Sequence, residues 1–214
     1  MKHFIKTYAV SHEILENTEA AYLQSKDLLE AYLSELLWWN KKINLVSRGV
    51  SRETLRAHVR HSLLPSALSL LNGTDYWIDT GTGGGLPGVP LAITEPDKRW
   101  ILNDISAKKM AAVKQIIHKL ALGNASGEAK SLESMKIAGG MGVISKHAFS
   151  VQGLMSMVDG KPWEKIIFYK GADEAENEIK KLPYPVSCTI YRLEFGKKAP
   201  FYQGKGIVVI RQLL

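Results

Sequence analysis

The stretch YWIDTGTGGGLPG, residues 76–88, decides the fold of this 214-residue chain. Its first letters, YWI, form an apolar run typical of a buried strand, and Asp79 ends that run. Glycines follow at positions 81, 83, 84 and 85, and Pro87 and Pro90 mark the start of a helix. A strand, a glycine turn and a helix in this order begin a βαβ unit whose turn lets a ligand approach the backbone. We therefore expect a ligand site at this turn.

From this turn to the end of the chain, short apolar runs alternate with helical patterns over residues 73–214. This alternation predicts an α/β domain with a mostly parallel, seven-stranded sheet. The clearest helix spans Ala107 to Leu120, with Ser106 as its N-cap. The last two strands have no long helical pattern between them, so we expect an antiparallel hairpin at one edge of the sheet. The expected strands cover residues 76–80, 99–103, 125–129, 142–146, 165–170, 187–194 and 206–211.

Residues 1–72, which precede this domain, are predicted to form a helical extension that leans on it. Apolar positions recur in pairs four residues apart over residues 19–40, which predicts one amphipathic helix. A second helix is expected to begin at the N-cap Ser51 and to run toward Leu71, with Pro65 kinking or dividing it.

The composition favours a globular protein of the cytoplasm. Hydrophobic residues make up 45% of the chain and charged residues 23%, a balance typical of soluble domains. The first residues contain no apolar signal region, and no stretch approaches the roughly 18 apolar residues that a membrane span requires. No membrane partner is therefore expected. Cys188 is the single cysteine, and His58 and His61 have no third ligand at a suitable spacing, so no metal site is expected.

Part of the chain's net charge of +7 is clustered in residues 38–72, which hold six basic residues and one acid. Three arginines recur every four residues and therefore share one helix face, where they can follow a phosphate backbone. The alternative is a solvated basic face that has no ligand. The predicted RNA-binding residues are Lys41, Lys42, Arg48, Arg52, Arg56 and Arg60.

The acid before the glycine turn distinguishes two kinds of cofactor. Gly83, Gly85 and Gly88 match the G-x-G-x-x-G template, so a dinucleotide-dependent oxidoreductase is one alternative. However, a carboxylate at Asp79 repels a pyrophosphate and attracts the ammonium and sulfonium groups of S-adenosylmethionine. Asp104 ends the next strand, 25 residues later, where its side chain can accept hydrogen bonds from both ribose hydroxyls. The pair of acids favours S-adenosylmethionine over an ordinary turn with a capping aspartate.

Several further motifs carry a family resemblance. They are WNKKINLVS at 39–47, the segment from His58 to Ser62, DTGTGGGLPGVPLA at 79–92, LNDISAKK at 102–109, VISKHAFS at 143–150 and FYKG at 168–171. On these motifs the chain resembles the bacterial family of small-subunit ribosomal RNA guanine-N7 methyltransferases called RsmG, or glucose-inhibited division protein B. The similarity covers nearly the whole chain.

The resemblance implies a class I methyltransferase fold, which is Rossmann-like, and S-adenosylmethionine as the cofactor. It implies methylation of N7 of a guanine in 16S ribosomal RNA, either free or in the small ribosomal subunit. The sequence itself does not fix whether the protein dimerises, and a monomer is our expectation. By position, Gly81 and Leu86 would line the methionine side of the cofactor, and Leu132 and Glu133 would border its adenine. The full set of expected cofactor residues is Asp79, Gly81, Thr82, Gly83, Gly85, Leu86, Asp104, Leu132, Glu133 and Lys146.

Catalysis at a guanine N7 is expected to depend on positioning, because the nitrogen lone pair is available without a general base. Lys146 and Lys170 are the residues expected to position substrate or cofactor. Ion pairing of Lys170 with the acidic segment 173–178 is the structural alternative.

Three residues depart from the family pattern, namely Lys146 in place of an arginine, His61 in place of an aspartate and Ile105 in place of a small residue. A lysine cannot make the paired contacts of a guanidinium. A second alternative is therefore a diverged, non-catalytic RNA-binding or ribosome-assembly protein that retains the cofactor fold.

Overall fold

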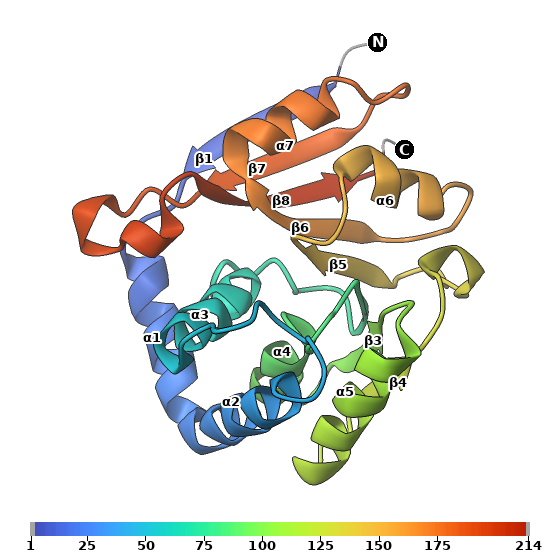
Figure 1. The fold of residues 1–214 in the computed structure, drawn as a ribbon. Coiled ribbons are helices and arrows are strands. Elements are labelled where there is room, and N and C mark those ends of the chain that lie inside the picture. The colour runs from blue at the N-terminus through green and yellow to red at the C-terminus, as the bar shows by residue number, and fades with distance from the viewer. Residues whose placement is uncertain (1–2, 213–214) are drawn as a thin grey trace.

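Strand β2 (Tyr76–Thr80) lies inside the sheet, and four of its five residues are buried as a result. In the computed structural model, which describes residues 3–212, one eight-stranded sheet has the order β1-β7-β8-β6-β5-β2-β3-β4 (Figure 1). The predicted α/β fold is confirmed, and each predicted strand is present. The observed strands are β1 (Phe4–Ala9), β2, β3 (Arg99–Asn103), β4 (Ala125–Glu128), β5 (Gly142–Lys146), β6 (Lys165–Gly171), β7 (Ser187–Arg192) and β8 (Lys205–Arg211).

The prediction of seven strands misses β1, which pairs in parallel with β7 and forms the edge of the sheet. Most of its residues are exposed, including Phe4 and Tyr8, so the segment has no alternating apolar pattern. The predicted antiparallel hairpin is also displaced from the edge. Strand β8 lies between β6 and β7 and is antiparallel to both, while the other neighbouring strands are parallel.

The helices cover both faces of the sheet. They are α1 (Glu13–Gln24), α2 (Lys26–Asn40), α3 (Arg52–Ala67), α4 (Gly88–Thr94), α5 (Ala107–Lys119), α6 (Val151–Met157) and α7 (Ala172–Ile179). Apolar residues of α1 to α5 share a core with Trp77 and Trp100 of the sheet. Helices α6 and α7 pack against Val143 and Phe168 on the opposite face (Figure 1). No helix among residues 3–212 is long and apolar enough to cross a membrane.

The single helix predicted over residues 19–40 is two helices, separated at Ser25. Helix α1 packs mainly on α3, whereas α2 packs on α3, α4 and α5, and the chain changes direction between the two helices (Figure 1). No glycine or proline marks this break in the sequence. Helix α3 ends at Ala67, two residues after Pro65, rather than continuing toward Leu71. The division at residue 72 stays a prediction, and the core shared across it argues against independent folding of the two parts.

Internal ion pairs connect the three helices of the extension. Glu30 of α2 lies 2.6 Å from Arg52 Nη2 and 2.6 Å from Arg56 Nε, both on α3. Arg60 Nε lies 2.5 Å from Glu19 Oε2 on α1. The predicted common face of these arginines exists, but it faces the carboxylates of α1 and α2. The N–H groups expected to follow an RNA backbone therefore hold the extension together.

We predict that Glu30→Gln lowers the free energy of unfolding by about 1 to 2 kcal/mol at neutral pH. Hydrogen bonds from Arg56 and the neighbouring cations keep the pKa of Glu30 well below its usual range. Its contribution is therefore present above the ordinary carboxyl pKa and is lost as the pH falls. Denaturant unfolding at several pH values measures this, and the wild type and the variant should converge at low pH.

The matched control is Glu53→Gln, because Glu53 pairs with the same Arg56 but its side chain is 81% exposed. This change should alter the free energy of unfolding by less than about 0.5 kcal/mol. Equal losses in the two variants would contradict the central role of Glu30.

Candidate active site

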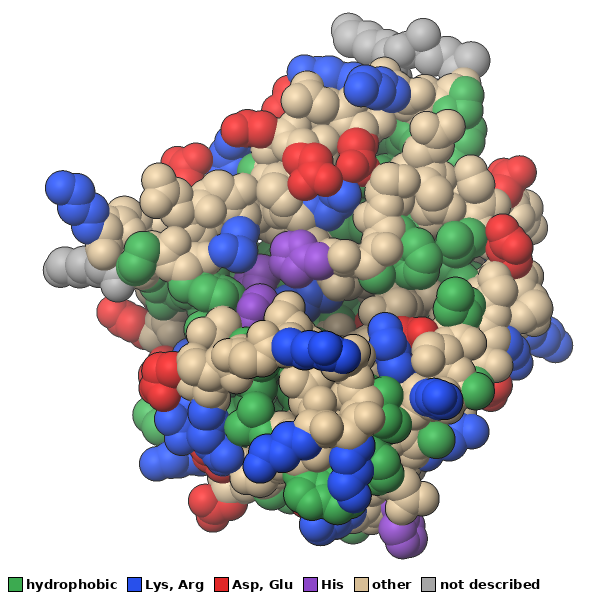
Figure 2. Space-filling model, in the orientation of Figure 1, with side chains coloured by type: hydrophobic (Ala, Val, Ile, Leu, Met, Phe, Trp, Pro, Cys, Tyr) green, Lys and Arg blue, Asp and Glu red, His purple; other side chains and the backbone are tan. Residues whose placement is uncertain are grey.

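A cavity of about 800 Å³ opens at the carboxyl ends of β2, β3 and β5, within the size range of small-molecule sites. Figure 2 shows this hollow near the middle of the molecule, with histidine side chains at its edge. The cavity brings together most of the predicted cofactor residues from four separate segments. Those that line it are Gly81, Thr82, Gly83, Leu86, Asp104, Leu132, Glu133 and Lys146.

The glycine turn is fixed by hydrogen bonds to Asp79, whose side chain does not line the cavity. Asp79 is fully buried, and its Oδ2 accepts hydrogen bonds from Thr82 Oγ1 (2.5 Å) and from the backbone N–H of Gly88 (2.8 Å). The first N–H groups of a helix have no partner within the helix, which explains the contact with Gly88 at the start of α4. The structure therefore gives Asp79 a role in organising the turn. Gly85 likewise lies outside the cavity wall, against Val89.

The charge of Asp79 nevertheless suits a cationic ligand. Burial raises its pKa to about 7, although the hydrogen bonds from Thr82 and Gly88 and the charge of Lys146 oppose this rise. Its Oδ1 is buried and has no hydrogen-bond partner among residues 3–212. A sulfonium or ammonium group above the turn would stabilise this carboxylate. The residues present thus fit S-adenosylmethionine better than a pyrophosphate.

Asp104 lies on the cavity wall at the end of β3 in a fixed orientation. Its Oδ2 accepts a hydrogen bond from Gly83 N (3.2 Å), and its Oδ1 accepts one from Ser106 N (2.9 Å). These contacts leave further lone pairs of the carboxylate available to the cavity, as a ribose-binding acid requires. Ile105, the departure beside it, is 79% exposed and lies at the cavity wall. Its bulk therefore narrows the site without disturbing Asp104.

The wall that holds Leu132 and Glu133 is fixed by a lysine that the sequence analysis missed. Lys161 Nζ donates to the carbonyl oxygens of Leu132 (3.1 Å), Glu133 (2.6 Å) and Met135 (2.8 Å). An ammonium group can satisfy three acceptors at once, so Lys161 fixes the short 3-10 turn Leu132–Ser134. No motif includes this contact, because its partners are more than 25 residues away in the chain.

Lys146 lies at the opposite wall of the cavity. It is 7% exposed, and its Nζ donates to the His58 carbonyl oxygen (2.8 Å) and to Ser62 Oγ (3.2 Å). Burial lowers its pKa to about 7, while the charge of Asp79 opposes this change. His61 is fully buried, and its ring lies 5.0 Å from that of Tyr169. His58 and His147, which the sequence analysis did not assign to the site, also line the cavity.

Lys170 does not reach the cavity. Its Nζ lies 3.1 Å from Glu174 and 3.0 Å from Glu178, and its side chain is 8% exposed. Lys170 therefore forms ion pairs with the acidic segment 173–178, which was the alternative considered from the sequence.

The segment between α2 and α3 forms another part of the wall. Leu45, Val46, Ser47 and Val50 line the cavity, although the sequence analysis predicted only basic residues here. Lys41, Lys42 and Arg48 belong to this segment. Lys42 Nζ lies 3.3 Å from the ring centroid of Trp38, which is 47% exposed. The WNKKINLVS motif was the sequence signal for this part of the wall, because its apolar residues Leu45 and Val46 line the cavity.

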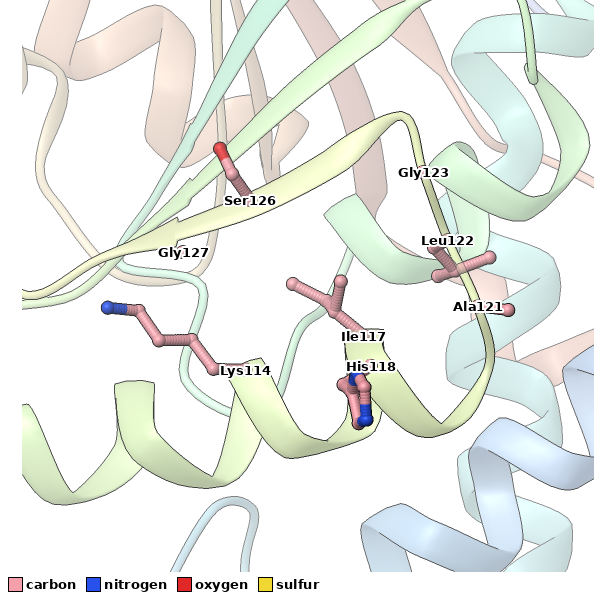
Figure 3. Close-up of a pocket in the computed structure, with 8 residues that line it drawn as sticks. All are labelled: Lys114, Ile117, His118, Ala121, Leu122, Gly123, Ser126 and Gly127. Atoms are coloured by element: carbon pink, nitrogen blue, oxygen red, sulfur yellow. The ribbon is translucent and has the colours of Figure 1, made fainter.

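A second hollow of about 520 Å³ lies between α5 and β4 (Figure 3). Lys114, Ile117 and Leu122 are among the residues that line it. None of the predicted cofactor residues contributes to it, so we do not assign it to the active site. Among residues 3–212, no group of three or more His, Cys, Asp or Glu side chains is placed to hold a metal ion.

Two solved structures with a similar architecture are methyltransferases. An O-methyltransferase from Bacillus cereus in complex with S-adenosylhomocysteine aligns over 85% of this chain and 90% of its own, with a TM-score of 0.58 and 17% identity. Magnesium protoporphyrin IX methyltransferase from Synechocystis with bound S-adenosylmethionine aligns over 82% and 89%, with a TM-score of 0.54 and 14% identity. These neighbours show that the chain has the fold of class I methyltransferases, and the residues of its cavity fit the predicted cofactor, S-adenosylmethionine.

Sequence relatives identify the family. The family model described as rRNA small subunit methyltransferase G matches residues 25–195. Two relatives are named ribosomal RNA small subunit methyltransferase G. The one from Chlorobium limicola is 33% identical over 94% of this chain and 93% of the relative. The one from Photobacterium profundum is 35% identical over 87% of this chain and 89% of the relative. The chain belongs to this family, which is also called GidB. The oxidoreductase alternative receives no support from these relatives.

We predict that Asp104→Ala weakens the binding of S-adenosylmethionine by about 100-fold, because up to two hydrogen bonds to a charged acceptor are lost. Titration calorimetry measures the dissociation constant. Glu128→Ala is the matched control, since Glu128 ends the neighbouring strand β4 but does not line the cavity. Unchanged affinity in Asp104→Ala would remove this acid from the methyl-donor site.

A second prediction concerns Gly81, whose φ is +68°. A Cβ at this position would lie 2.9 Å from Phe149 and would also collide with Ala148. We expect Gly81→Ala to lower the free energy of unfolding by about 2 to 4 kcal/mol and to weaken cofactor binding. Gly73 has a similar φ of +73° with nothing within 4 Å of the added Cβ.

Gly73→Ala should therefore cost only the backbone strain, about 1 kcal/mol, and leave cofactor affinity unchanged. Denaturant unfolding and titration calorimetry on Gly81→Ala and Gly73→Ala separate the cost of the positive φ from the cost of the steric overlap. Equal losses of stability would show that the packing against residues 148 and 149 is unimportant.

Proposed function

We propose that this protein transfers a methyl group to N7 of a guanine in 16S ribosomal RNA of the small ribosomal subunit. The observation that carries the proposal is the cavity at the glycine turn, lined by Asp104 and Lys146, in a chain whose relatives are named ribosomal RNA small subunit methyltransferase G. We further propose that it acts as a monomer in the cytoplasm, where its RNA substrate is found, with residues 1–72 contributing to RNA binding.

When bound, S-adenosylmethionine supplies an electrophilic methyl group on a sulfonium. The N7 of guanine presents its lone pair at the major-groove edge, so this site has no need of a group that removes a proton. The residues act by orientation, which can supply a large part of the rate acceleration. Asp104 and the turn of Leu132 and Glu133 hold the donor side of the cavity, with Lys161 fixing that turn.

Lys146 has the geometry of a positioning residue. An ammonium group has three N–H donors, and the contacts to His58 and Ser62 use two of them. The third can donate to guanine O6 or to a phosphate at the cavity wall. An anionic or carbonyl oxygen in that place stabilises the charged form of a lysine whose pKa is about 7.

We assign the outer RNA contact to Lys41, Lys42 and Arg48, beside the cavity wall formed by residues 45–50. A cationic segment at the entrance attracts the phosphate backbone of RNA. Arg52, Arg56 and Arg60 contribute indirectly, since their ion pairs fix the helices that carry this segment. Lys170 also acts indirectly, through its contacts with α7.

The non-catalytic alternative predicts binding of both cofactor and RNA without methyl transfer, and the replacements at Lys146 and His61 are the observations in its favour. Labelled methyl transfer decides between the two functions. We expect incorporation into a guanine of undermethylated 16S RNA, presented as naked RNA or as small subunits, with the modified base located by mass spectrometry of nuclease fragments.

The Asp104→Ala variant is the control for cofactor-dependent transfer, and it should give no label. Binding of both ligands with no incorporation would establish the non-catalytic function. Label at another base or in protein would overturn the proposed acceptor.

A further inference from the structure

A group of basic side chains lies at the cavity wall away from Asp104. His58 of α3, Lys146 at the end of β5 and His147 line this wall, and Lys205 at the start of β8 is close enough to lower the pKa of each of them. Figure 2 shows histidine side chains gathered in the hollow. Helix α3 and the end of β5 therefore place N–H donor groups on one part of the cavity wall. Lys205 is not part of that wall, and its Nζ donates to the carbonyl oxygen of Phe201.

The two lysines of this group form no ion pair among the described residues, although Glu174 is close enough to His147 to raise the pKa of its imidazole. Among residues 3–212, neither Lys146 nor Lys205 lies within ion-pair distance of a carboxylate, since Asp79 is buried beneath the glycine turn and Glu174 pairs with Lys170. The pKa of His58 is lowered to about 4, first by burial and then by the charges of Lys146, His147 and Lys205. Uncompensated cations in a partly buried site are unfavourable, and an anionic ligand reverses that effect.

The backbone at His147, a residue of the cavity wall, is strained. Its φ is +55°, a conformation that costs about 1 kcal/mol or more in a residue with a Cβ. The side chain is exposed, and its ring lies 6.1 Å from the buried ring of His61. His61 supports it from the interior, and its own nitrogens have no partner among the described residues. A strained residue on the wall of a cavity suggests a ligand contact.

We propose that His58, Lys146 and His147 form a phosphate-binding subsite, which takes a backbone phosphate of the RNA beside the acceptor base. Lys205 lies outside the cavity wall and contributes its charge to this subsite. This subsite rests on the proposed function, because the RNA supplies the phosphate. Imidazole N–H groups and ammonium groups are hydrogen-bond donors, and several donors from different directions suit a tetrahedral anion. The subsite lies in the same cavity as Asp104, so a phosphate held there fixes the neighbouring base beside the methyl donor.

Two variants test the subsite in the full-length protein. His147→Gly removes the imidazole and relieves the backbone strain, so it should not impair folding. Lys205→Gln removes one charge and leaves the cavity wall intact, since Lys205 is not part of that wall. Lys114→Gln is the control, because Lys114 lines the separate hollow beside β4 (Figure 3). Fluorescence anisotropy over a range of salt concentrations measures affinity for a 16S RNA fragment, and calorimetry measures affinity for S-adenosylmethionine.

We expect His147→Gly and Lys205→Gln each to weaken RNA binding by about tenfold, with unchanged cofactor affinity. Only Lys205→Gln should also reduce the salt dependence, by about 0.7 to 0.9 in the slope of log affinity against log salt. Lys114→Gln should change neither. Wild-type RNA affinity and slope in both subsite variants, with methyl transfer by the wild type intact, would overturn the subsite alone.

Inorganic phosphate separates the two sources of the anion. Weak competition, at millimolar phosphate, is the result expected of a site built for an RNA phosphate. Tight binding of inorganic phosphate that is lost in the variants, with RNA affinity unaffected, would overturn the assignment to RNA. Absence of RNA binding by the wild type would overturn both the subsite and the proposed function.

Discussion

The buried carboxylate of Asp79 connects the parts on which the site depends. It accepts hydrogen bonds from Thr82 in the glycine turn and from Gly88 at the start of α4, so strand, turn and helix meet at one side chain. A Cβ on Gly88 would lie 2.6 Å from Asp79 Oδ2, which explains a glycine at that position. The turn fixed in this way presents Gly83 N to Asp104, and Asp104 in turn defines the wall of the cavity. Burying a charge is unfavourable, as the raised pKa of Asp79 shows, so the interaction is suited to a protein that binds a cationic donor.

Burial decided which parts of the fold could be predicted from the sequence. Strands such as β2 and β6 are buried on both faces, and their continuous apolar runs mark them clearly. Strand β1 lies at an edge and is mostly exposed, so it lacks the apolar pattern that marks a buried strand, although Phe4, Ile5 and Tyr8 are residue types common in strands. The break at Ser25 lets α2 reach α4 and α5 while α1 stays on α3, and only the folded structure contains those contacts. Local signals therefore identified the elements, and tertiary contacts corrected their number and ends.

The same distinction holds in the site. The glycine turn and Asp104 were predictable because strand ends in a parallel sheet meet at one edge. Lys161 and His147 were not, because their partners lie far away in the chain or depend on a single backbone angle. The spacing of Arg52, Arg56 and Arg60 correctly placed them on one face but could not show that Glu30 and Glu19 would lie opposite. A count of basic residues thus overstated the charge available to RNA in α3. Lys146, which has no carboxylate partner within residues 3–212, lies on the cavity wall instead.

The replacements at Lys146 and His61 are best understood together. Without a carboxylate at position 61, the polar contacts of Lys146 are a carbonyl oxygen and a hydroxyl, and burial brings its pKa to about 7. Its charge then responds to what the cavity holds. A sulfonium nearby disfavours the ammonium form, whereas a phosphate or a guanine carbonyl favours it. The sulfonium and the RNA thus shift the protonation of Lys146 in opposite directions. An anion between the sulfonium and the ammonium group of Lys146 offsets the repulsion between these two cations. Because the lone pair of guanine N7 needs no base, the site can use a lysine with this pKa for orientation rather than for proton transfer.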